Sequence, residues 1–290
     1  MTLIPTRTVL EAAASAGTAI GAFNVLHLET AEALVGAAED TGLPVILQLS
    51  ENCVNYHGAF EPIARATLAV AEASSARVAV HLDHAEDVEL ALRAIDGGFG
   101  SVMYDGAKLD FADNVATTRR VVAHAAEAGV LVEAELGEIG GKDGAHAPGV
   151  RTDPAEAAQF VAETGVDALA VAVGSSHAMT ERVAALDLEL IARLHAAVPV
   201  PLVLHGSSGV PDETIVAGIA AGLTKINVST HLNAAFTGAI RDYLAEHPTA
   251  VDSRKYLAAG RDAVRIEAGR MLRLFASPAT AGTTGRDGIG

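Results

Sequence analysis

The stretch "RVAVHLDHAEDVELAL", residues 77–92, places a short apolar run before a cluster of ionisable side chains and a helix-like pattern. Residues 78–80 have the β-branched and apolar character of a buried strand. His81, Asp83 and His84 follow at its carboxyl end, and apolar residues then recur with helical spacing. A buried strand that ends in two imidazoles around a carboxylate is either a packing feature or a chemical site.

The same order of strand, helix and Gly or Pro recurs along the chain. The predicted strands are Ala19–Val25, Pro44–Ser50, Arg77–His84, Ser101–Gly106, Leu131–Gly137, Ala168–Gly174, Pro201–His205 and Thr224–Val228. The helical patterns between them cover Leu28–Thr41, Phe60–Ser74, Val88–Gly97, Asn114–Ala128, Pro154–Thr164, Leu188–Ala197 and Glu213–Ala221. Eight such repeats favour an α/β fold with a single (β/α)8 TIM barrel over an open sheet. No GxGxxG motif follows the first strand, as a dinucleotide-binding sheet would need.

We expect one barrel domain over residues 1–276 and a disordered tail over residues 277–290. Asp252–Ala276 predicts one or two extra C-terminal helices beyond the barrel, whereas the tail is small and polar.

Composition narrows the class of protein. Half of the residues are hydrophobic and the net charge is −16, which argues against general binding to nucleic acid or to anionic membranes. No apolar run approaches the roughly 18 to 20 residues that cross a bilayer, and the N-terminus lacks the order of a secretory signal. Cys53 is the only cysteine, so no internal disulfide can form. These features predict a cytoplasmic protein.

Every predicted strand ends in or is followed by a polar side chain. These residues are Asn24, Ser50, Asp83 with His84, Asp105, Glu133 with Glu135, His177, His205 and Asn227. The carboxyl ends of barrel strands converge on one face, where barrel enzymes keep their active sites. The barrel therefore favours a chemical site at residues 81–84.

His84, His177 and His205 follow the third, sixth and seventh strands, and three imidazoles with open positions are typical of catalytic zinc. The alternative is that each is a hydrogen-bonded structural histidine, which is less favoured for three at equivalent places. His81 lies deeper in its strand and is expected to be packed or to support a ligand. Asp83 is predicted either to exchange protons with a substrate oxygen or to hold a histidine tautomer.

The loops after the last two strands read "LHGSSGVPDE" (204–213) and "KINVSTHLN" (225–233). Barrels often bind phosphate at these loops through backbone N–H groups and a helix N-terminus. Gly206, Ser208, Ser229 and Thr230 are the candidate donors. The alternative for the hydroxyl residues is ordinary helix capping.

Seven stretches together resemble the class II, metal-dependent ketose-bisphosphate aldolases, in the branch of the fructose- and tagatose-bisphosphate enzymes. They are "GAFNV" (21–25), "PVILQLS" (44–50), "HLDHAEDVELALRAIDGGFGSVMYDG" (81–106), "VEAELGEIGG" (132–141), "TGVDALAVAVGSSH" (164–177), "PLVLHGSSGVPDE" (201–213) and "TKINVST" (224–230). The resemblance runs from about residue 3 to residue 276.

The resemblance implies a lyase of carbohydrate metabolism, as in glycolysis, that makes or cleaves a ketose bisphosphate. Dihydroxyacetone phosphate would be the nucleophile half, an aldehyde the acceptor, and a zinc-stabilised enediolate the intermediate. His84, His177 and His205 would hold the catalytic Zn²⁺, and Asp83 would be the acid/base on the aldehyde oxygen. The family also suggests a homodimer or homotetramer.

Further roles are implied residue by residue. Asn24, Ser50 and Asn227 would bind the triose part, and Gly206, Ser208, Ser229 and Thr230 its phosphate. Asp105 and Glu135 match positions that hold a second or displaced divalent metal, and a monovalent cation is a further expected cofactor. Arg254 aligns with a basic residue that contacts the phosphate of the aldehyde half, and in an oligomer it would serve a neighbouring subunit.

The loop after the fifth strand departs from the family. It reads "GGKDGAHAPGVRTDP" (140–154), with Lys142 and Asp143 where relatives have glutamate. Asp143 is expected to replace that glutamate as the base at carbon, and His146 is the alternative. The acceptor stays open: the aldolase of inositol catabolism that cleaves 2-deoxy-5-keto-gluconate 6-phosphate is a second hypothesis. A catalytically silent sugar-phosphate-binding homologue and a zinc hydrolase on the same scaffold are the others.

Overall fold

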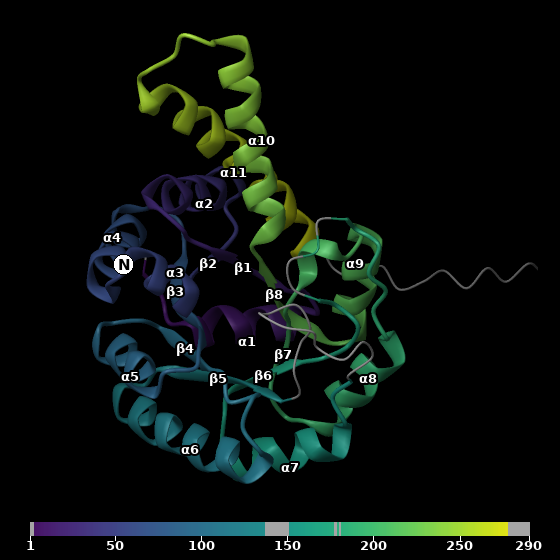
Figure 1. Ribbon diagram of the computed structural model, residues 1–290. Coiled ribbons are helices and arrows are strands. Elements are labelled where there is room, and N and C mark those ends of the chain that lie inside the picture. Colours follow the sequence, from purple (N-terminus) through teal and green to yellow (C-terminus); the bar gives the residue numbers. More distant parts are fainter. Residues whose placement is uncertain (1–2, 137–150, 177–178, 180, 278–290) are drawn as a thin grey trace, which may run out of the picture.

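The computed structural model describes residues 3–136, 151–176, 179 and 181–277. In this part of the chain eight parallel strands close into a barrel in the order β1 to β8, and helices surround it (Figure 1). The strands are β1 (Ile20–Asn24), β2 (Val45–Ser50), β3 (Val78–Ala85), β4 (Ser101–Tyr104), β5 (Leu131–Leu136), β6 (Ala168–Val171), β7 (Leu202–Leu204) and β8 (Leu223–Val228). The helices are α1 (Thr6–Ala16), α2 (Leu28–Thr41), α3 (Glu51–His57), α4 (Phe60–Ala73), α5 (Val88–Asp96), α6 (Phe111–Ala128), α7 (Pro154–Thr164), α8 (Leu188–Ala197), the 3₁₀ helix η1 (Ser207–Gly209), α9 (Asp212–Ala221), α10 (Thr230–Glu246) and α11 (Ser253–Phe275). The predicted TIM barrel with extra C-terminal helices is confirmed.

Short polar residues set where the helices begin. Asp87 and Asp153 accept hydrogen bonds from the first backbone N–H groups of α5 and α7, which satisfies donors that a helix start leaves without partners. Asp110 does the same for α6, so this helix begins at Phe111, three residues before the predicted start. The predicted bounds of α2, α7 and α8 agree with the structure.

Two segments differ from the prediction. β6 ends at Val171 rather than Gly174, because the next residue, Ala172, pairs with Thr152 instead of with β7. The Ala172 backbone N–H donates to Thr152 Oγ1 at 2.8 Å, and the Thr152 N–H donates to the Ala172 carbonyl at 3.1 Å. Helix α3 follows β2 directly and was not predicted, since its seven residues show no apolar period.

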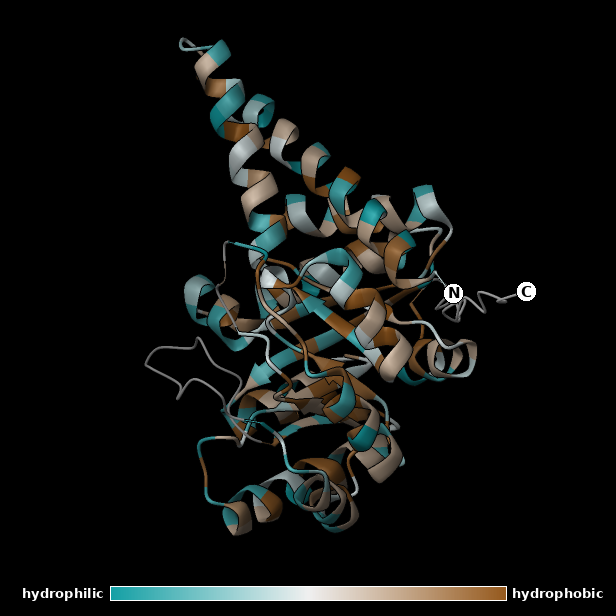
Figure 2. Ribbon diagram, turned by 90° about the vertical axis from the view of Figure 1, so that its right-hand side faces the viewer, coloured by the Kyte–Doolittle hydropathy of each residue, from teal (hydrophilic) through white to brown (hydrophobic). Residues whose placement is uncertain are grey.

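Side chains alternate along each strand between the barrel interior and the surrounding helices. The apolar interior cluster is made of Val9, Leu10, Ala13, Ile20, Ala22, Ile46, Ala79, Met103, Leu131, Ala168, Ala170, Ala172 and Val203. Three of these belong to α1, which therefore closes the floor of the barrel. A larger apolar cluster lies between strands and helices, and the strands are largely hydrophobic in Figure 2. This packing holds the strand ends of the opposite face in fixed positions.

Helices α10 and α11 form a hairpin that projects from the barrel as an arm (Figures 1 and 2). The base of the arm is anchored, since Phe275 of α11 lies fully buried with its ring centroid 6.4 Å from that of Phe23. No helix in the described ranges is both long and apolar enough to cross a membrane.

Candidate active site

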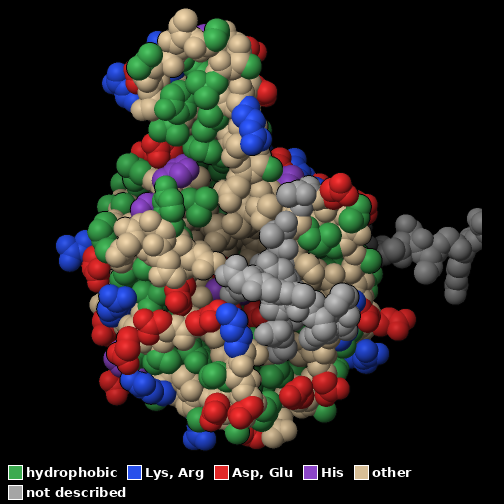
Figure 3. All heavy atoms as spheres, viewed as in Figure 1, with side chains coloured by type: hydrophobic (Ala, Val, Ile, Leu, Met, Phe, Trp, Pro, Cys, Tyr) green, Lys and Arg blue, Asp and Glu red, His purple; other side chains and the backbone are tan. Residues whose placement is uncertain are grey.

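The carboxyl ends of the strands surround a cavity of about 500 Å³, which opens as a hollow in the barrel face (Figure 3). Residues of both predicted groups, the metal and triose set and the phosphate set, line it. They are Asn24, Ser50, Asp83, His84, Gly206, Ser208, Asn227, Ser229 and Thr230. The structure therefore brings together residues that are up to about two hundred positions apart in the sequence.

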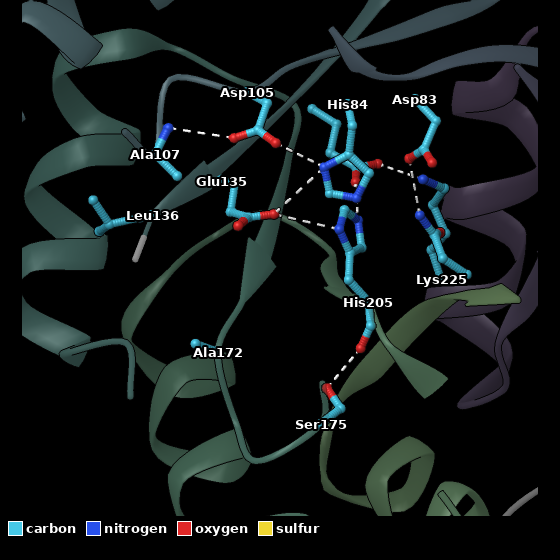
Figure 4. A network of polar contacts seen from close by, with 12 residues as sticks. Asp83, His84, Asp105, Ala107, Glu135, Leu136, Ala172, Ser175, His205 and Lys225 are labelled. Atoms are coloured by element: carbon cyan, nitrogen blue, oxygen red, sulfur yellow. Dashed lines mark hydrogen bonds and ion pairs between the residues drawn. The ribbon is translucent and has the colours of Figure 1, made fainter. Parts of the chain in front are cut away.

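His84 is held in an unusual backbone conformation at the end of β3. Its φ is 48°, in the left-handed region that side chains other than glycine rarely adopt. The pairing of β3 with β4 is irregular between Leu82 and Ala85, around the same residue. The buried ring places Nδ1 2.7 Å from Asp105 Oδ2 and 3.9 Å from Glu135 Oε2 (Figure 4). Asp105 thus fixes the orientation of the imidazole.

His205 lies fully buried after β7, with its ring centroid 4.5 Å from that of His84. Its Nε2 is 2.9 Å from Glu133 Oε1, and its Nδ1 is 3.4 Å from Glu135 Oε2 (Figure 4). The Ser175 hydroxyl donates to the His205 carbonyl at 2.6 Å, which anchors the backbone. Burial lowers the pKa of His205, but hydrogen bonds to Glu133 and Glu135 outweigh it and raise the pKa to about 9. Without a metal, these carboxylates attract a proton to the imidazole.

Two overlapping groups of buried side chains have the composition of a metal site. One is Asp83, His84 and His205, and the other is His84, Asp105 and Glu135, each with candidate ligand atoms within 4.8 Å of one another. Imidazole nitrogens beside carboxylate oxygens suit Zn²⁺ and other first-row divalent ions. Hydrogen bonds to carboxylates also agree with metal binding, because the second ring nitrogen of a ligating histidine usually bonds such a group. The residues present fit a divalent cation.

Asp83 lies beside the histidines and faces two amide donors. Asn227 Nδ2 donates to Asp83 Oδ1 at 3.1 Å, and Gln48 Nε2 lies 3.4 Å from Oδ2 and 2.7 Å from Asn24 Oδ1. Burial raises the pKa of Asp83, but the nearby imidazoles of His84 and His205 outweigh it and leave the pKa below its usual value. The carboxyl group is therefore ionised and oriented to accept a proton.

The opposite wall of the cavity is made by η1 and the start of α10. Gly206 adopts φ 64°, a conformation that glycine takes without strain, and it turns the chain into η1. Ser229 occupies the N-cap position of α10, but its side chain makes no capping hydrogen bond in the structure. The capping alternative thus does not account for Ser229, but it does hold for Ser208, whose Oγ accepts from the His231 N–H in the first turn of α10 at 3.1 Å. The Ser229 hydroxyl, Thr230 and the helix N-terminus are placed to receive an anion.

The far end of the cavity was missed by the sequence reasoning, because most of it lies on the unpredicted helix α3 or in loops. Glu51, Asn52, Asn55, Glu86 and Lys108 line this end. The Lys108 ammonium lies 2.9 Å and 3.0 Å from the two carboxylate oxygens of Glu86. This end of the cavity is therefore polar, and the positive charge of Lys108 is paired there with the carboxylate of Glu86.

Four further predicted residues remain, and of these only Arg254 is among the described residues. His177, Asp143 and the alternative base His146 fall outside the described residues. Arg254 is not among the residues that line the cavity: it lies in the first turn of α11, its side chain is 89% exposed, and it binds the Asp252 carboxylate. Within one chain, Arg254 therefore belongs to the arm rather than to the cavity.

Three buried polar residues beside the site, Gln48, Glu133 and Lys225, are not among the predicted site residues. Gln48 bonds to Asn24 and lies close to Asp83, while Lys225 and Glu133 pair with each other at 2.7 Å. The sequence does mark two of these residues, because Gln48 in "PVILQLS" and Lys225 in "TKINV" are polar residues within otherwise apolar strands. His81, expected to be packed or supporting, is fully buried, and burial together with Lys225 lowers its pKa to about 3.

Known proteins resemble this chain over almost its whole length. A model of the family described as fructose-bisphosphate aldolase class-II matches residues 4–280. A fructose-bisphosphate aldolase from Geobacillus stearothermophilus is 39% identical over 285 residues, which cover 97% of this chain and 99% of that protein. One from Thermus caldophilus is 39% identical over 296 residues, covering 93% and 96%. Among solved structures, the YdjI aldolase from Escherichia coli K12 matches with a TM-score of 0.84 at 32% identity, covering 95% and 98%.

Proposed function

Because this chain belongs to the class II fructose-bisphosphate aldolase family, and is thus a carbon–carbon lyase, we propose that it forms and cleaves a ketose 1,6-bisphosphate. Dihydroxyacetone phosphate is the nucleophile half, and fructose or tagatose 1,6-bisphosphate is the full substrate. One observation carries the proposal: a single cavity has Asp83 and His84 on one wall and the loop of Gly206 and Ser208 on the other. The relatives do not favour the aldolase of inositol catabolism or a silent homologue.

The metal in this proposal is zinc, held by His84, His205 and His177. When bound, it supplies the positive charge that stabilises the anion left on the triose half as the carbon–carbon bond breaks. Asp105 and Glu135 lie against the two described imidazoles, and in this proposal they also hold a second or displaced divalent ion. A monovalent cation near the phosphate is a further proposed cofactor.

Asp83 is the proposed acid/base. In cleavage its carboxylate accepts the proton of the C4 hydroxyl, and in condensation it returns that proton to the aldehyde oxygen. The amide donors of Gln48 and Asn227 hold the carboxylate in place, so that its position does not depend on the substrate.

The triose half is bound along the cavity. Asn24, Ser50 and Asn227 are the proposed contacts of its oxygens. Its phosphate lies against the backbone of Gly206 and the hydroxyls of Ser208, Ser229 and Thr230, at the N-terminus of the long helix α10. These are neutral donors, so affinity comes from oriented N–H and O–H groups rather than from a cationic side chain.

Other parts of the proposal rest on the family pattern. Asp143 is the proposed base at the carbon that becomes nucleophilic. We also propose a cytoplasmic homodimer or homotetramer whose α10–α11 arm contacts a second copy. Hydrophobic side chains gather on the arm (Figure 3), and Leu244 and Val251 are exposed there. In such an assembly, Arg254 would serve the phosphate of the aldehyde half in the neighbouring subunit.

The test separates chemistry from substrate choice. Exchange of the dihydroxyacetone phosphate proton with solvent needs no acceptor, so it is measured with and without a chelator, and in Asp143→Ala. We expect Zn²⁺-dependent exchange that falls in the variant, together with cleavage of fructose or tagatose 1,6-bisphosphate. A Zn²⁺-loaded protein that neither exchanges this proton nor cleaves either ketose refutes the proposed function.

A further inference from the structure

A layer of polar side chains that includes one ion pair lies inside the barrel, beneath the cavity and above the apolar interior cluster. Lys225 of β8, Glu133 of β5 and His81 of β3 are all fully buried. The Lys225 ammonium donates to Glu133 Oε2 at 2.7 Å and lies 3.3 Å from His81 Nε2. None of the three lines the cavity, so no substrate atom touches them in the proposed function.

Stability gives little reason for an ion pair at this depth. Burying two charges carries a desolvation penalty that often exceeds their attraction, and apolar side chains of similar volume are frequently as stabilising or more so. Two residues earlier on β3 and β5 the inward positions hold Ala79 and Leu131, so apolar side chains occupy the interior one level below. The charges therefore point to a role other than cohesion of the barrel.

The hydrogen bonds of Glu133 specify the tautomer of His205. An ionised carboxylate only accepts hydrogen bonds. Oε2 receives the Lys225 ammonium, and Oε1 lies 2.9 Å from His205 Nε2, so Nε2 must carry the hydrogen. The lone pair of the neutral ring is then on Nδ1, the nitrogen on the side of Glu135 and the metal site.

A chain of hydrogen bonds ties this layer to the barrel floor. If His81 Nε2 accepts from Lys225, its Nδ1–H donates to Ser101 Oγ at 2.7 Å. Ser101 Oγ is in turn 2.8 Å from Thr6 Oγ1 in α1. The ammonium is thus held directly by groups from β5 and β3, and His81 is itself tied to β4 and α1, which leaves the ammonium little freedom to turn away from Glu133.

We propose that Lys225 and Glu133 are positioning residues that set the tautomer and orientation of His205, so that metal affinity depends on a lysine that does not touch the metal. The inference rests on the proposed metal site. Removal of an outer hydrogen-bonding partner of a metal ligand typically weakens binding about 10- to 100-fold. The same change in a merely structural ion pair would alter stability and leave metal affinity unchanged.

The test is a double-mutant cycle with Lys225→Met, Glu133→Gln and the double variant. In Lys225→Met, Glu133 loses the donor that holds its Oε2, so the carboxylate no longer keeps His205 in one orientation. We therefore expect Zn²⁺ affinity to fall by about 10- to 100-fold. In Glu133→Gln, the ammonium takes the single amide oxygen and turns the NH₂ group toward His205 Nε2. The ring must then carry its hydrogen on Nδ1, and affinity falls as well. In the double variant the amide is free to turn its oxygen to Nε2–H, so affinity rises above that of Glu133→Gln.

Zn²⁺ dissociation constants are measured by competition with a chromophoric chelator, and urea unfolding of each metal-free variant is measured in parallel. Lys255→Met, an exposed lysine of α11, is the matched control and is expected to bind Zn²⁺ like the parent. Cobalt-substituted variants give a second readout, because a changed ligand geometry alters the Co²⁺ absorption spectrum.

The outcomes distinguish the two levels of inference. The positioning role is overturned if the losses of Zn²⁺ affinity in the two single variants simply sum in the double variant. It is also overturned if Zn²⁺ affinity stays unchanged in every variant while the free energy of unfolding falls. Should Lys225→Met not fold, Glu133→Gln alone decides, since parent-like affinity in that variant contradicts the tautomer argument. A parent protein that binds no Zn²⁺ instead contradicts the proposed metal site.

Discussion

Replacement of Asp83 by Asn should separate the two halves of the reaction. The substitution keeps the size of the side chain but removes its ability to take a proton. Its new NH₂ group must then face another hydrogen-bond donor, either Asn227 Nδ2, now 3.1 Å from Oδ1, or Gln48 Nε2, now 3.4 Å from Oδ2. Loss of a general base costs about 10²- to 10⁴-fold in rate, which corresponds to about 3 to 5 kcal/mol in activation free energy. We expect cleavage of the ketose bisphosphate to fall by that factor.

Proton exchange of dihydroxyacetone phosphate should respond differently. It does not involve the aldehyde oxygen, so in Asp83→Asn its rate is expected to stay within about tenfold of the parent, less than the loss of a general base costs. Both rates are measured on protein of equal metal content, which excludes loss of metal as the cause. Glu127→Gln, a change to an exposed carboxylate on α6, serves as the control and should leave both rates unchanged. Equal losses in exchange and in cleavage would refute the assignment of Asp83 to the aldehyde half.

Three further perturbations test the phosphate loop, the support of the arm and the metal. Gly206→Ala places a side chain on a residue whose φ is 64°, which costs about 1 to 2 kcal/mol. We therefore expect a higher KM for the phosphorylated substrate and unfolding at lower urea concentration. An unchanged KM contradicts the proposed phosphate contact. Burial raises the pKa values of Asp212 and Glu267, but hydrogen bonds from Arg270 outweigh it and hold both below normal. The two ionised carboxylates therefore stabilise the fold fully above roughly pH 5, and this stabilisation is lost as the pH falls through their folded-state pKa values. In Arg270→Met, the free energy of unfolding should therefore fall less between pH 7 and pH 3 than it does in the parent. Dialysis against a chelator should abolish cleavage, and added Zn²⁺ should restore it. The far-UV circular dichroism spectrum should stay unchanged, because the barrel core is apolar. Full activity after chelation contradicts the proposed metal site.

The sequence predicts the barrel well because strand and helix periods differ clearly in this chain. Pro154 and Gly165 mark the limits of α7, and its predicted bounds agree with the structure. Helix α3 was missed because "ENCVNYH" lacks an apolar period, and Ser50 begins it by capping the Cys53 N–H. Local pattern does not reveal an element that depends on one hydrogen bond after a strand.

The sequence predicts which strand ends come together in the candidate site, because parallel strands of a closed barrel have their carboxyl ends on one face. It does not predict the pairing within the site. That Asp105 bonds to His84 while Glu133 bonds to His205 depends on the stagger of β4, β5 and β7 across the barrel. Sequence spacing alone does not give this stagger, and so Lys225 and Gln48 received no role.

The backbone of His84 explains how "HLDH" can offer both the proposed acid/base, Asp83, and a proposed metal ligand, His84, from adjacent residues. Along a regular strand, His81 and Asp83 face the interior and the next residue faces the surrounding helices. A positive φ of 48° and the irregular pairing with β4 break this alternation, so that His84 also lines the cavity. Such a conformation costs about 1 to 3 kcal/mol and persists only where the surroundings impose it. Here the surroundings include the hydrogen bond to Asp105 at 2.7 Å and the closed barrel. The unusual backbone of this residue is therefore what lets Asp83 and His84, adjacent in the chain, line the same cavity.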